Sequence, residues 1–274
     1  MVTRQEIAAD LRGLGIGTGD LVAVHSSLKS IGRVEGGAPT VVEAFLDVLG
    51  PTGNLLVPTF SFTFATWEPG ALFEPSKTPS KVGAVTEAAR KHPRCRRSLH
   101  PTHSVGVIGP LADELTRDHL ASSPIGPGSP FDRFRERNGT VLMIGCDLDS
   151  CSILHLYEVL AGLPYIDIAF REGYAHELAN IGRNGKKVVG LQLYEIPGCS
   201  VGFVNAEPVL EKSGVLRHGR IRNARSLLFR SRDAGEVLIA ELRRRPDLLL
   251  CTRTECSICP RRRAVVRARS SGRG

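Results

Sequence analysis

The residue types best suited to chemistry in this chain lie in one segment, GCDLDSCSILHLYEVLAGLP, residues 145–164. The segment follows the apolar run TVLMIG, which predicts a buried strand, and its own spacing predicts a helix over roughly residues 150–163. His155 and Glu158 are three residues apart, so on a helix their side chains lie on one face and can meet. A carboxylate on one imidazole nitrogen fixes the tautomer and leaves the other nitrogen able to accept a proton. The pair indicates a general base for an amine nucleophile, although this spacing is also typical of a solvated surface pair.

Two histidines and two serines lie in a second segment, RSLHPTHSVGVIG, residues 97–109. A turn around Pro101 could present the Ser104 hydroxyl and backbone amides to an oxyanion. His100 and His103 at this spacing could also ligate a metal. A structural turn with a buried histidine is the third interpretation, and the sequence leaves all three open.

Small residues dominate a third segment, HSSLKSIGRVEGGA, residues 25–38. Ser26 and Ser27 end an apolar run, and Gly32, Gly36 and Gly37 permit close backbone approach and exposed amides. These features suit a phosphate-bearing or pantetheine-like ligand, and a plain loop fits them equally well. The segment is neither GxGxxG nor GxxxxGK[ST], so it indicates neither a dinucleotide-binding site nor a P-loop.

The elements that must position these residues alternate between strand and helix. Apolar runs predict strands near residues 21–28, 54–62, 104–109 and 140–145, and helical spacing predicts helices near residues 1–15, 40–50, 82–92 and 110–120. This alternation predicts an α/β fold: a single domain with a largely parallel central sheet flanked by helices. Residues 174–202 predict shorter, more polar strands, and residues 203–250 predict helices, so we expect a C-terminal elaboration.

The net charge of +8 is concentrated at the C-terminus, where residues 261–274 contain six arginines and no acid. Such a segment could bind nucleic acid or anionic lipid, but a disordered end is the favoured interpretation. We therefore expect one folded domain over residues 1–260 and a basic, disordered tail over residues 261–274. No apolar run approaches the roughly 20 residues of a membrane span, and the N-terminal residues lack the apolar core of a signal peptide. A cytoplasmic protein that binds neither membrane nor nucleic acid is the expectation.

Seven cysteines, an odd number, favour reduced thiols over a disulfide framework. Cys251, Cys256 and Cys259 are clustered, and Cys199 is a candidate fourth ligand. Thiolates at such spacings hold structural zinc, so the sequence leaves zinc and free thiols as alternatives. Cys146 and Cys151 lie near the predicted base, where a buried structural thiol is favoured over a nucleophile.

Taken in order, four segments resemble the aminoglycoside 3-N-acetyltransferase family over roughly residues 5–165. They are VHSSLKSIGRVEGGAPTVVEAFLDVLGPTGNLLVPTFS, RSLHPTHSVGVIG, GPGSPFDRF and SILHLYE. The resemblance implies a single α/β domain that transfers an acetyl group from acetyl-coenzyme A to an amine, in that family the 3-amino group of a 2-deoxystreptamine aminoglycoside. It implies no covalent enzyme intermediate and no catalytic metal.

The resemblance also implies roles for individual residues. His155 matches the catalytic base, Glu158 matches its partner, and Ser152 matches a position usually held by threonine, whose hydroxyl helps the tetrahedral intermediate. The positions that match those around the cofactor are Ser26, Ser27, Gly32, Gly37, Thr59, His100 and Ser104.

The chain departs from the family pattern in two places. Cys151 stands where the family usually has asparagine, and the second half is sparse in the acids that grip a polycationic sugar. The candidates for an anionic pocket are Asp147, Asp149, Asp167, Glu172 and Glu195. The acceptor could therefore be a biosynthetic amine or another amino sugar.

Other classes of function remain as alternatives. One is a non-catalytic binding protein that uses the basic, cysteine-rich C-terminus, and another is a hydrolase of thioesters or amides. The chain has no nucleophile-elbow sequence, which disfavours the hydrolase. A small-molecule amine is the expected partner, and a homodimer is left open.

Overall fold

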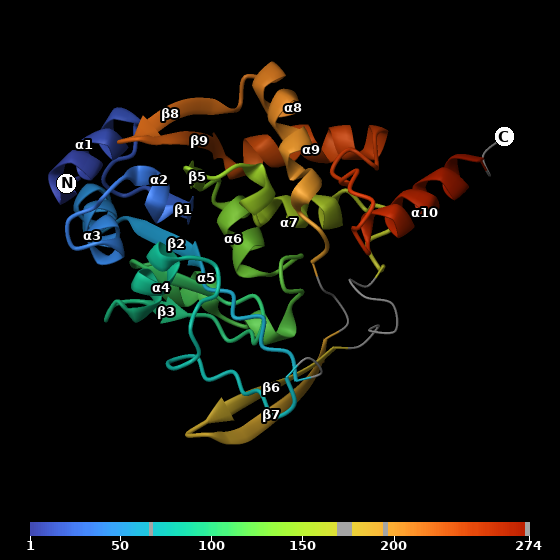
Figure 1. The fold of residues 1–274 in the computed structure, drawn as a ribbon, viewed down its shortest axis with the longest axis horizontal. Helices are drawn as coiled ribbons and strands as arrows, with labels where there is room; N and C mark the ends of the chain where they lie inside the picture. The colour runs from blue at the N-terminus through green and yellow to red at the C-terminus, as the bar shows by residue number, and fades with distance from the viewer. Residues whose placement is uncertain (66–67, 169–176, 194–196, 272–274) are drawn as a thin grey trace.

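Seven strands form one mixed sheet in the computed structural model, which describes residues 1–65, 68–168, 177–193 and 197–271 (Figure 1). The strands are β1 (Leu21–Ser26), β2 (Asn54–Pro58), β3 (Arg96–Arg97), β4 (Val105–Ile108), β5 (Thr140–Ile144), β8 (Arg217–Ile221) and β9 (Ala224–Arg230). Their order across the sheet is β3-β4-β2-β1-β5-β9-β8.

Parallel pairing is confined to the centre of the sheet. The central strand β1 pairs in parallel with β2 on one side and β5 on the other, whereas the outer pairs are antiparallel. The predicted α/β class is confirmed, but the sheet is mixed rather than largely parallel. The short connection between β8 and β9 explains part of the difference, because strands joined by a two-residue hairpin must be antiparallel.

The prediction of helices throughout residues 203–250 is wrong for residues 217–230, which form β8 and β9. Arginines at both ends of this stretch hide its alternation. In β9 the residue pattern places Leu227 and Leu228 on opposite faces of the sheet, where each joins a different core.

Helices cover both faces of the sheet. On one face Val22 and Val24 of β1 join one hydrophobic core, and on the other face Leu21 and Ala23 join a second. The first layer holds α1 (Arg4–Gly13), α3 (Ala38–Leu49) and α4 (Ala84–Lys91), with the short α2 (Leu28–Ile31) after β1. The second layer holds α5 (Ala112–Thr116), α6 (Pro130–Glu136), α7 (Ile153–Leu160), α8 (Glu207–Lys212) and α9 (Ser231–Arg244). Short 3₁₀ turns are η1 (His119–Ala121), η2 (Leu148–Ser150) and η3 (Val201–Ala206).

A two-stranded hairpin of β6 (Glu177–Arg183) and β7 (Lys186–Leu193) lies apart from the main sheet (Figure 1). Asn184 and Gly185 turn it with φ values of 52° and 76°, both in the left-handed region that a tight hairpin requires. The buried Phe73 attaches it to the loop after β2: Phe73 N–H donates to the Asn180 carbonyl over 2.8 Å. The sequence predicts short polar strands within residues 174–202, and β6 and β7 confirm this prediction.

The C-terminal basic segment folds as a helix, α10 (Cys259–Ser271), and not as a disordered tail over the residues described. Arg262 in its first turn is 1% exposed. The expected boundary after residue 260 therefore falls inside α10, and residues 272–274 lie outside the described part. Within that described part, the structure has no helix both long enough and apolar enough to cross a membrane.

Candidate active site

Helix α7 carries His155 and Glu158, and the structure brings the two side chains into contact. The strand β5 ends at Ile144, the turn η2 follows, and α7 begins at Ile153. His155 Nδ1 lies 2.8 Å from Glu158 Oε2, and because an ionised carboxylate only accepts, Nδ1 carries the hydrogen. Glu158 is 1% exposed and His155 is 8% exposed, so this is a buried pair rather than a solvated one.

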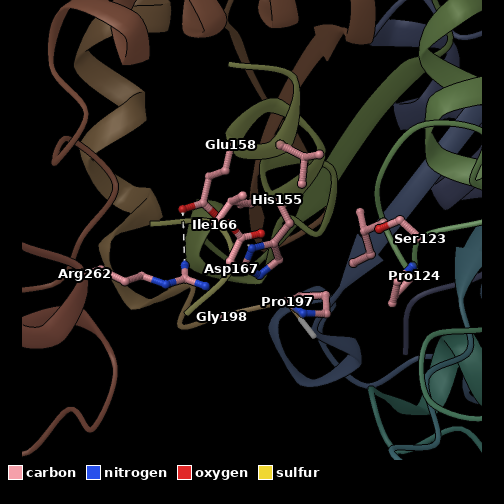
Figure 2. Close-up of a pocket in the computed structure, with 11 residues that line it drawn as sticks. Ser123, Pro124, His155, Glu158, Ile166, Asp167, Pro197, Gly198 and Arg262 are labelled. Carbon is pink, nitrogen blue, oxygen red and sulfur yellow. Dashed lines mark hydrogen bonds and ion pairs between the residues drawn. The ribbon is translucent and has the colours of Figure 1, made fainter. Parts of the chain in front are cut away.

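The second oxygen of Glu158 has two further partners. The Tyr165 hydroxyl donates to Oε1 over 3.1 Å, and Nη1 of the buried Arg262 lies 3.7 Å from the same oxygen (Figure 2). Burial and the neighbouring Glu158 raise the pKa of Tyr165, which keeps its phenol protonated and donating. The Arg262 guanidinium lies 5.0 Å from the centre of the Tyr165 ring. A buried carboxylate is thereby held by one cation and two hydrogen-bond donors, which meets the requirement for burying charge.

Two hollows meet at His155. The first, which we call the Arg262 hollow, is lined by Ser123, Pro124, Ile125, His155, Glu158, Val159, Ile166, Asp167, Pro197, Gly198 and Arg262 (Figure 2). The second, which we call the phenylalanine hollow, is lined by Phe60, Phe62, Phe64, Val82, His103, Ile125, Asp149, Ser150, Ser152, His155, Pro197, Gly198 and Ser200. The imidazole of His155 can therefore contact a ligand that enters from either hollow.

The outer nitrogen of His155 is available for proton transfer. Phe203 packs against the ring edge-to-face, with centroids 4.6 Å apart, and fixes its orientation. Within the described ranges, no residue forms a hydrogen bond with His155 Nε2. Ser152, one turn before His155, lines the phenylalanine hollow. The predicted catalytic trio therefore lies together, with the hydroxyl on one side of the base.

A neutral histidine, His103, forms part of the wall of the phenylalanine hollow. His103 lines the phenylalanine hollow, and its Nδ1 lies 2.7 Å from Thr102 Oγ1. Burial, followed by the nearby His155, lowers the pKa of His103 to about 3. A ring that stays neutral at this place adds no positive charge beside His155.

His119 supports the Arg262 hollow through a hydrogen bond to Pro124, one of the residues that line it. Because the Pro124 carbonyl can only accept, His119 carries its hydrogen on Nε2, and the Ser98 hydroxyl donates to His119 Nδ1 over 2.8 Å. His119 Nε2–H then donates to the Pro124 carbonyl over 3.0 Å. Burial lowers the pKa of His119 to about 4, consistent with this neutral tautomer.

Three of the predicted cofactor-binding residues form a layer behind the phenylalanine hollow. Thr59 and Ser104 are fully buried, and each hydroxyl donates to the other's carbonyl, over 3.0 and 2.9 Å. Arg97 Nε donates to both hydroxyl oxygens. His100 Nδ1 accepts from the His103 backbone N–H over 3.1 Å, which closes the turn around Pro101. The metal interpretation of His100 and His103 has no support, since neither belongs to a group of converging ligands in the described residues.

The other four predicted cofactor-binding residues surround α2. Ser26 ends β1, and Ser27 Oγ accepts from Ser30 Oγ over 2.9 Å. Gly32 and Gly37 have φ values of 113° and 69°, so both use the left-handed region. Among the described residues that line the two hollows, none of the seven predicted cofactor-binding residues appears.

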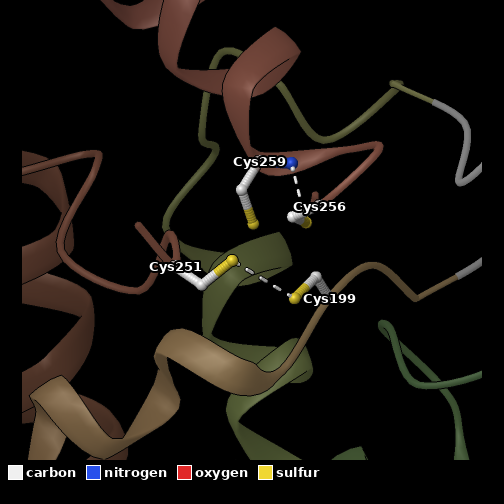
Figure 3. Close-up of side chains that lie close together, drawn as sticks. All are labelled: Cys199, Cys251, Cys256 and Cys259. Carbon is white, nitrogen blue, oxygen red and sulfur yellow. Dashed lines mark hydrogen bonds between the residues drawn. The ribbon is translucent and has the colours of Figure 1, made fainter. Parts of the chain in front are cut away.

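The four cysteines named as zinc-ligand candidates converge, with every pair of sulfurs within 4.8 Å (Figure 3). Such a group could hold a metal ion. Cys146 and Cys151 lie elsewhere: burial raises the pKa of Cys146 to about 11 and raises that of the fully buried Cys151 further. Neither thiol is poised to act as a thiolate nucleophile.

The candidate acids divide between the two hollows and the outer surface. Asp167 borders the Arg262 hollow and Asp149 borders the phenylalanine hollow, both exposed. Asp147 instead pairs with Arg225 at 3.5 Å. Glu172 and Glu195 lie outside the described residues.

Sequence reasoning missed Tyr165, Phe203 and Arg262. Tyr165 follows α7 closely, but a tyrosine after a helix carries no signal of its own. Arg262 is more than a hundred residues from Glu158 and stands among arginines whose composition indicates a tail. The one available signal is its place, three residues after a clustered cysteine.

Comparisons with known proteins all point to one family. The family model described as aminoglycoside 3-N-acetyltransferase matches residues 23–243. An aminoglycoside N(3)-acetyltransferase III from Salmonella sp. is 36% identical over 204 residues, which cover 68% of each chain. An aminoglycoside N(3)-acetyltransferase IV from Salmonella sp. is 31% identical over 249 residues, or 90% of each chain.

Solved structures match over nearly the whole chain. The apoenzyme of aminoglycoside acetyltransferase AAC(3)-IVa has a TM-score of 0.83 at 29% identity and covers 96% of this chain and 97% of its own. A histidine-to-alanine mutant of AAC(3)-IVa in complex with a gentamicin has a TM-score of 0.81 at 28% identity, covering 94% and 96%. AAC-IIIb, in a binary complex with CoASH, has a TM-score of 0.78 at 26% identity, covering 89% and 97%. The chain therefore belongs to the aminoglycoside 3-N-acetyltransferase family of acetyl-coenzyme A-dependent enzymes.

Proposed function

We propose that this protein acetylates the 3-amino group of a 2-deoxystreptamine aminoglycoside, with acetyl-coenzyme A as the donor and His155 as the general base. The position of His155 carries the proposal: its Nδ1 is held by Glu158 and its ring borders both hollows. A donor and an acceptor that enter separate hollows would meet at this ring. The complexes of relatives with a gentamicin and with CoASH support the choice of ligands. Because acetyl-coenzyme A is a cytoplasmic metabolite, we propose that the enzyme acts in the cytoplasm.

The chemistry of the hollows suggests which ligand occupies each. Phe60, Phe62 and Val82 give the phenylalanine hollow an apolar wall suited to a pantetheine arm and thioester. Asp167 borders the Arg262 hollow, where an exposed carboxylate favours a cationic amine. We propose that the thioester lies in the phenylalanine hollow and the amine enters from the Arg262 hollow.

The transfer step then needs one base and one group that stabilises an oxyanion. His155 Nε2 takes a proton from the amine. The amine nitrogen forms a bond to the thioester carbonyl carbon. Glu158 stabilises the imidazolium that results. The tetrahedral adduct collapses as its carbon–sulfur bond breaks, and the coenzyme A thiolate takes the proton from His155. A thioester is already activated, so no protein nucleophile is required.

We propose that the Ser152 hydroxyl donates to the oxyanion of the adduct, since it lines the phenylalanine hollow one turn before the base. One such donor typically contributes about 3 kcal/mol to the transition state. The resemblance that named Ser26, Ser27, Gly32, Gly37, Thr59, His100 and Ser104 motivates a further part of the proposal. The buried members among them shape the wall behind the thioester, and the segment from Ser26 to Gly37 borders the rest of the cofactor.

The test is acetyl transfer by the full chain to a panel of amines, with the product identified by mass spectrometry. The panel contains 2-deoxystreptamine aminoglycosides, amino sugars and simple polyamines. We expect an aminoglycoside product acetylated at the 3-amino group. Transfer only to another amine would contradict the proposed acceptor but keep the class of reaction. Release of free acetate without any acetylated amine would instead support the hydrolase.

A further inference from the structure

We propose that Cys199, Cys251, Cys256 and Cys259 hold a structural zinc ion, and that this site fastens α10 so that Arg262 reaches Glu158. The metal site itself is independent of the proposed function. The consequence for Arg262 rests on the proposed function, because it concerns the partner of the proposed base.

The arrangement of the sulfurs fits a tetrahedral metal. All six sulfur–sulfur separations are within 4.8 Å, and Cys199 Sγ lies 3.8 Å from Cys251 Sγ (Figure 3). A tetrahedron with zinc–sulfur bonds of about 2.3 Å has edges of about 3.8 Å. Small movements of the side chains would therefore bring all four thiolates onto one ion.

The surroundings of the cluster suit a metal held by four thiolates, which carries a net negative charge. The Cys259 backbone N–H donates to Cys256 Sγ over 3.4 Å, so one thiolate already has a donor. Arg263 Nη2 donates to the carbonyls of Leu250 and Cys251, over 3.1 Å each. A cation and an amide thus lie where they would offset the charge of the cluster.

The four cysteines come from three separate segments. Cys199 precedes η3, Cys251 follows the end of α9, and Cys256 and Cys259 stand at the start of α10 (Figure 3). An ion bound by all four would cross-link these segments. Such a cross-link stabilises a fold most where the segments would otherwise be joined by few contacts.

Helix α10 needs such an anchor, because much of its surface is polar. Between residues 260 and 269, every side chain except that of Arg262 is exposed or half-buried, and Val265 and Val266 are only partly buried against the core. The first turn nevertheless buries the guanidinium of Arg262 at 1% exposure. Burying an arginine is costly unless it is paired, and its ion pair with Glu158 is a rather long 3.7 Å. The apolar contacts of α10 alone are a weak source of the energy that holds this residue in place.

The path from the cluster to the catalytic pair is short. Arg262 lies three residues after Cys259, close to one helical turn. Its guanidinium passes beside Gly198, where any side chain would collide with it, and Gly198 is the neighbour of Cys199. The metal would therefore fix both walls of the gap through which Arg262 approaches Glu158. Arg262 is in this account a positioning residue for the His155–Glu158 pair.

A disulfide between Cys199 and Cys251 is the competing explanation of the close sulfurs. That bond needs a sulfur–sulfur distance of about 2.05 Å and would leave Cys256 and Cys259 without a role. The convergence of all four sulfurs favours the metal.

The first experiment measures the zinc content of the full chain, purified in reductant without chelator, by inductively coupled plasma mass spectrometry. We expect about one zinc ion per chain in the wild type and in Cys95→Ser, and well under half of that in Cys256→Ser. Cys95 is the control because it is a half-buried cysteine outside the cluster. Hydrogen exchange over residues 259–271 should accelerate in Cys256→Ser and in protein treated with a zinc chelator. A metal-free wild type, or an intact mass showing a disulfide, would overturn the metal site. Unchanged exchange after zinc removal would overturn the claim that the site fastens α10.

The second experiment isolates the link to the site with Arg262→Met and Arg262→Lys. We expect Arg262→Met to keep its zinc and to lose at least about tenfold in kcat with little change in KM for acetyl-coenzyme A, as removal of a buried ion-pair partner predicts. Arg262→Lys should restore part of kcat. Full activity in zinc-loaded Arg262→Met would overturn the positioning role. Zinc content and hydrogen exchange need no substrate, so failure of the proposed acetyl transfer would be seen separately.

Discussion

An imidazole and a carboxylate 2.8 Å apart do not by themselves make a catalytic base, and the described part of this chain contains two such pairs. His155–Glu158 and His218–Glu211 have the same separation. The side chains of the first pair are 10% and 1% exposed, whereas both side chains of the second are 46% exposed. Charges interact more strongly when water does not screen them, so Glu158 can stabilise an imidazolium and Glu211 contributes little. The surface pair is therefore a matched control for the buried one.

Ser152 offers a prediction about a single hydroxyl. Because one oxyanion donor is typically worth a factor of about a hundred or more in kcat, Ser152→Ala should lose roughly that much. The KM for acetyl-coenzyme A should stay close to that of the wild type. Ser150→Ala is the control, since Ser150 lines the same hollow but bonds to Asp149. Steady-state measurements of kcat and KM for both variants test this prediction. An equal loss of kcat in the two variants would contradict the role of Ser152.

At the scale of elements, one face of α7 carries the His155–Glu158 pair and another packs against the start of α9. A buried tyrosine forms a hydrogen bond on each side. Tyr165 donates to Glu158 behind the base, whereas the Tyr157 hydroxyl of α7 donates to the Ser231 carbonyl over 2.6 Å. Hydrogen bonds to charged groups are worth about 1.5–3 kcal/mol, so Tyr165→Phe should lower kcat by roughly tenfold or more. Tyr157→Phe should instead lower the free energy of unfolding by about 1–3 kcal/mol and keep kcat. Kinetics and urea unfolding of both variants check this, and a reversed pattern would refute it.

The elements that the sequence predicts well are those whose apolar spacing is uninterrupted. The helix expected over residues 150–163 is observed as α7, Ile153–Leu160, and the strands that flank the site lie within the expected ranges. The spacing of His155 and Glu158 is enough to place them on one face. What periodicity cannot supply is a partner from a distant segment: Arg262 reaches Glu158 only because α10 folds back, and its arginine-rich composition indicates the opposite. For the same reason the arginine-rich residues of β8 and β9 do not display the alternation of strands.

The residues predicted to bind the cofactor show a related limit. Motif order identifies Thr59, His100 and Ser104, yet the side chains that line the hollow are their neighbours, Phe60 and His103. Side chains alternate between the two faces of a strand, and those of a turn point in several directions. A motif therefore identifies the segment beside the hollow, but not which of two neighbouring side chains faces it. The direction of each side chain depends on packing that the sequence does not display.

At the scale of the whole molecule, several buried histidines predict how stability depends on pH. Burial lowers the pKa of His25 and His119 to about 4 and of His103 to about 3, and it lowers that of His100 as well. Each is neutral in the folded chain but binds a proton on unfolding once the pH is below about 6.5. The stabilisation is therefore complete above that pH and is lost as the pH falls toward the folded-state pKa values.

We expect the free energy of unfolding to fall by up to about 1.4 kcal/mol per histidine for each pH unit below about 6.5. Urea titrations between about pH 6.5 and 5, a window above the usual titration of carboxylates, should show an uptake of several protons on unfolding. His119→Gln, which keeps a donor and an acceptor, should reduce that uptake by about one proton. An unfolding free energy that does not change across this window would contradict the neutral, buried state of these rings.

The measurement that tests the central claim most directly is a double-mutant cycle on acetyl transfer, with His155→Ala, Glu158→Gln and both together. We predict that His155→Ala lowers kcat at least about a hundredfold, as loss of a general base requires. Because Glu158 is proposed to act through His155, the double variant should be hardly worse than His155→Ala alone. His218→Ala, the exposed counterpart, should keep wild-type kinetics. A His155→Ala enzyme with near wild-type kcat, or strictly additive losses in the cycle, would show that His155 is not the base supported by Glu158.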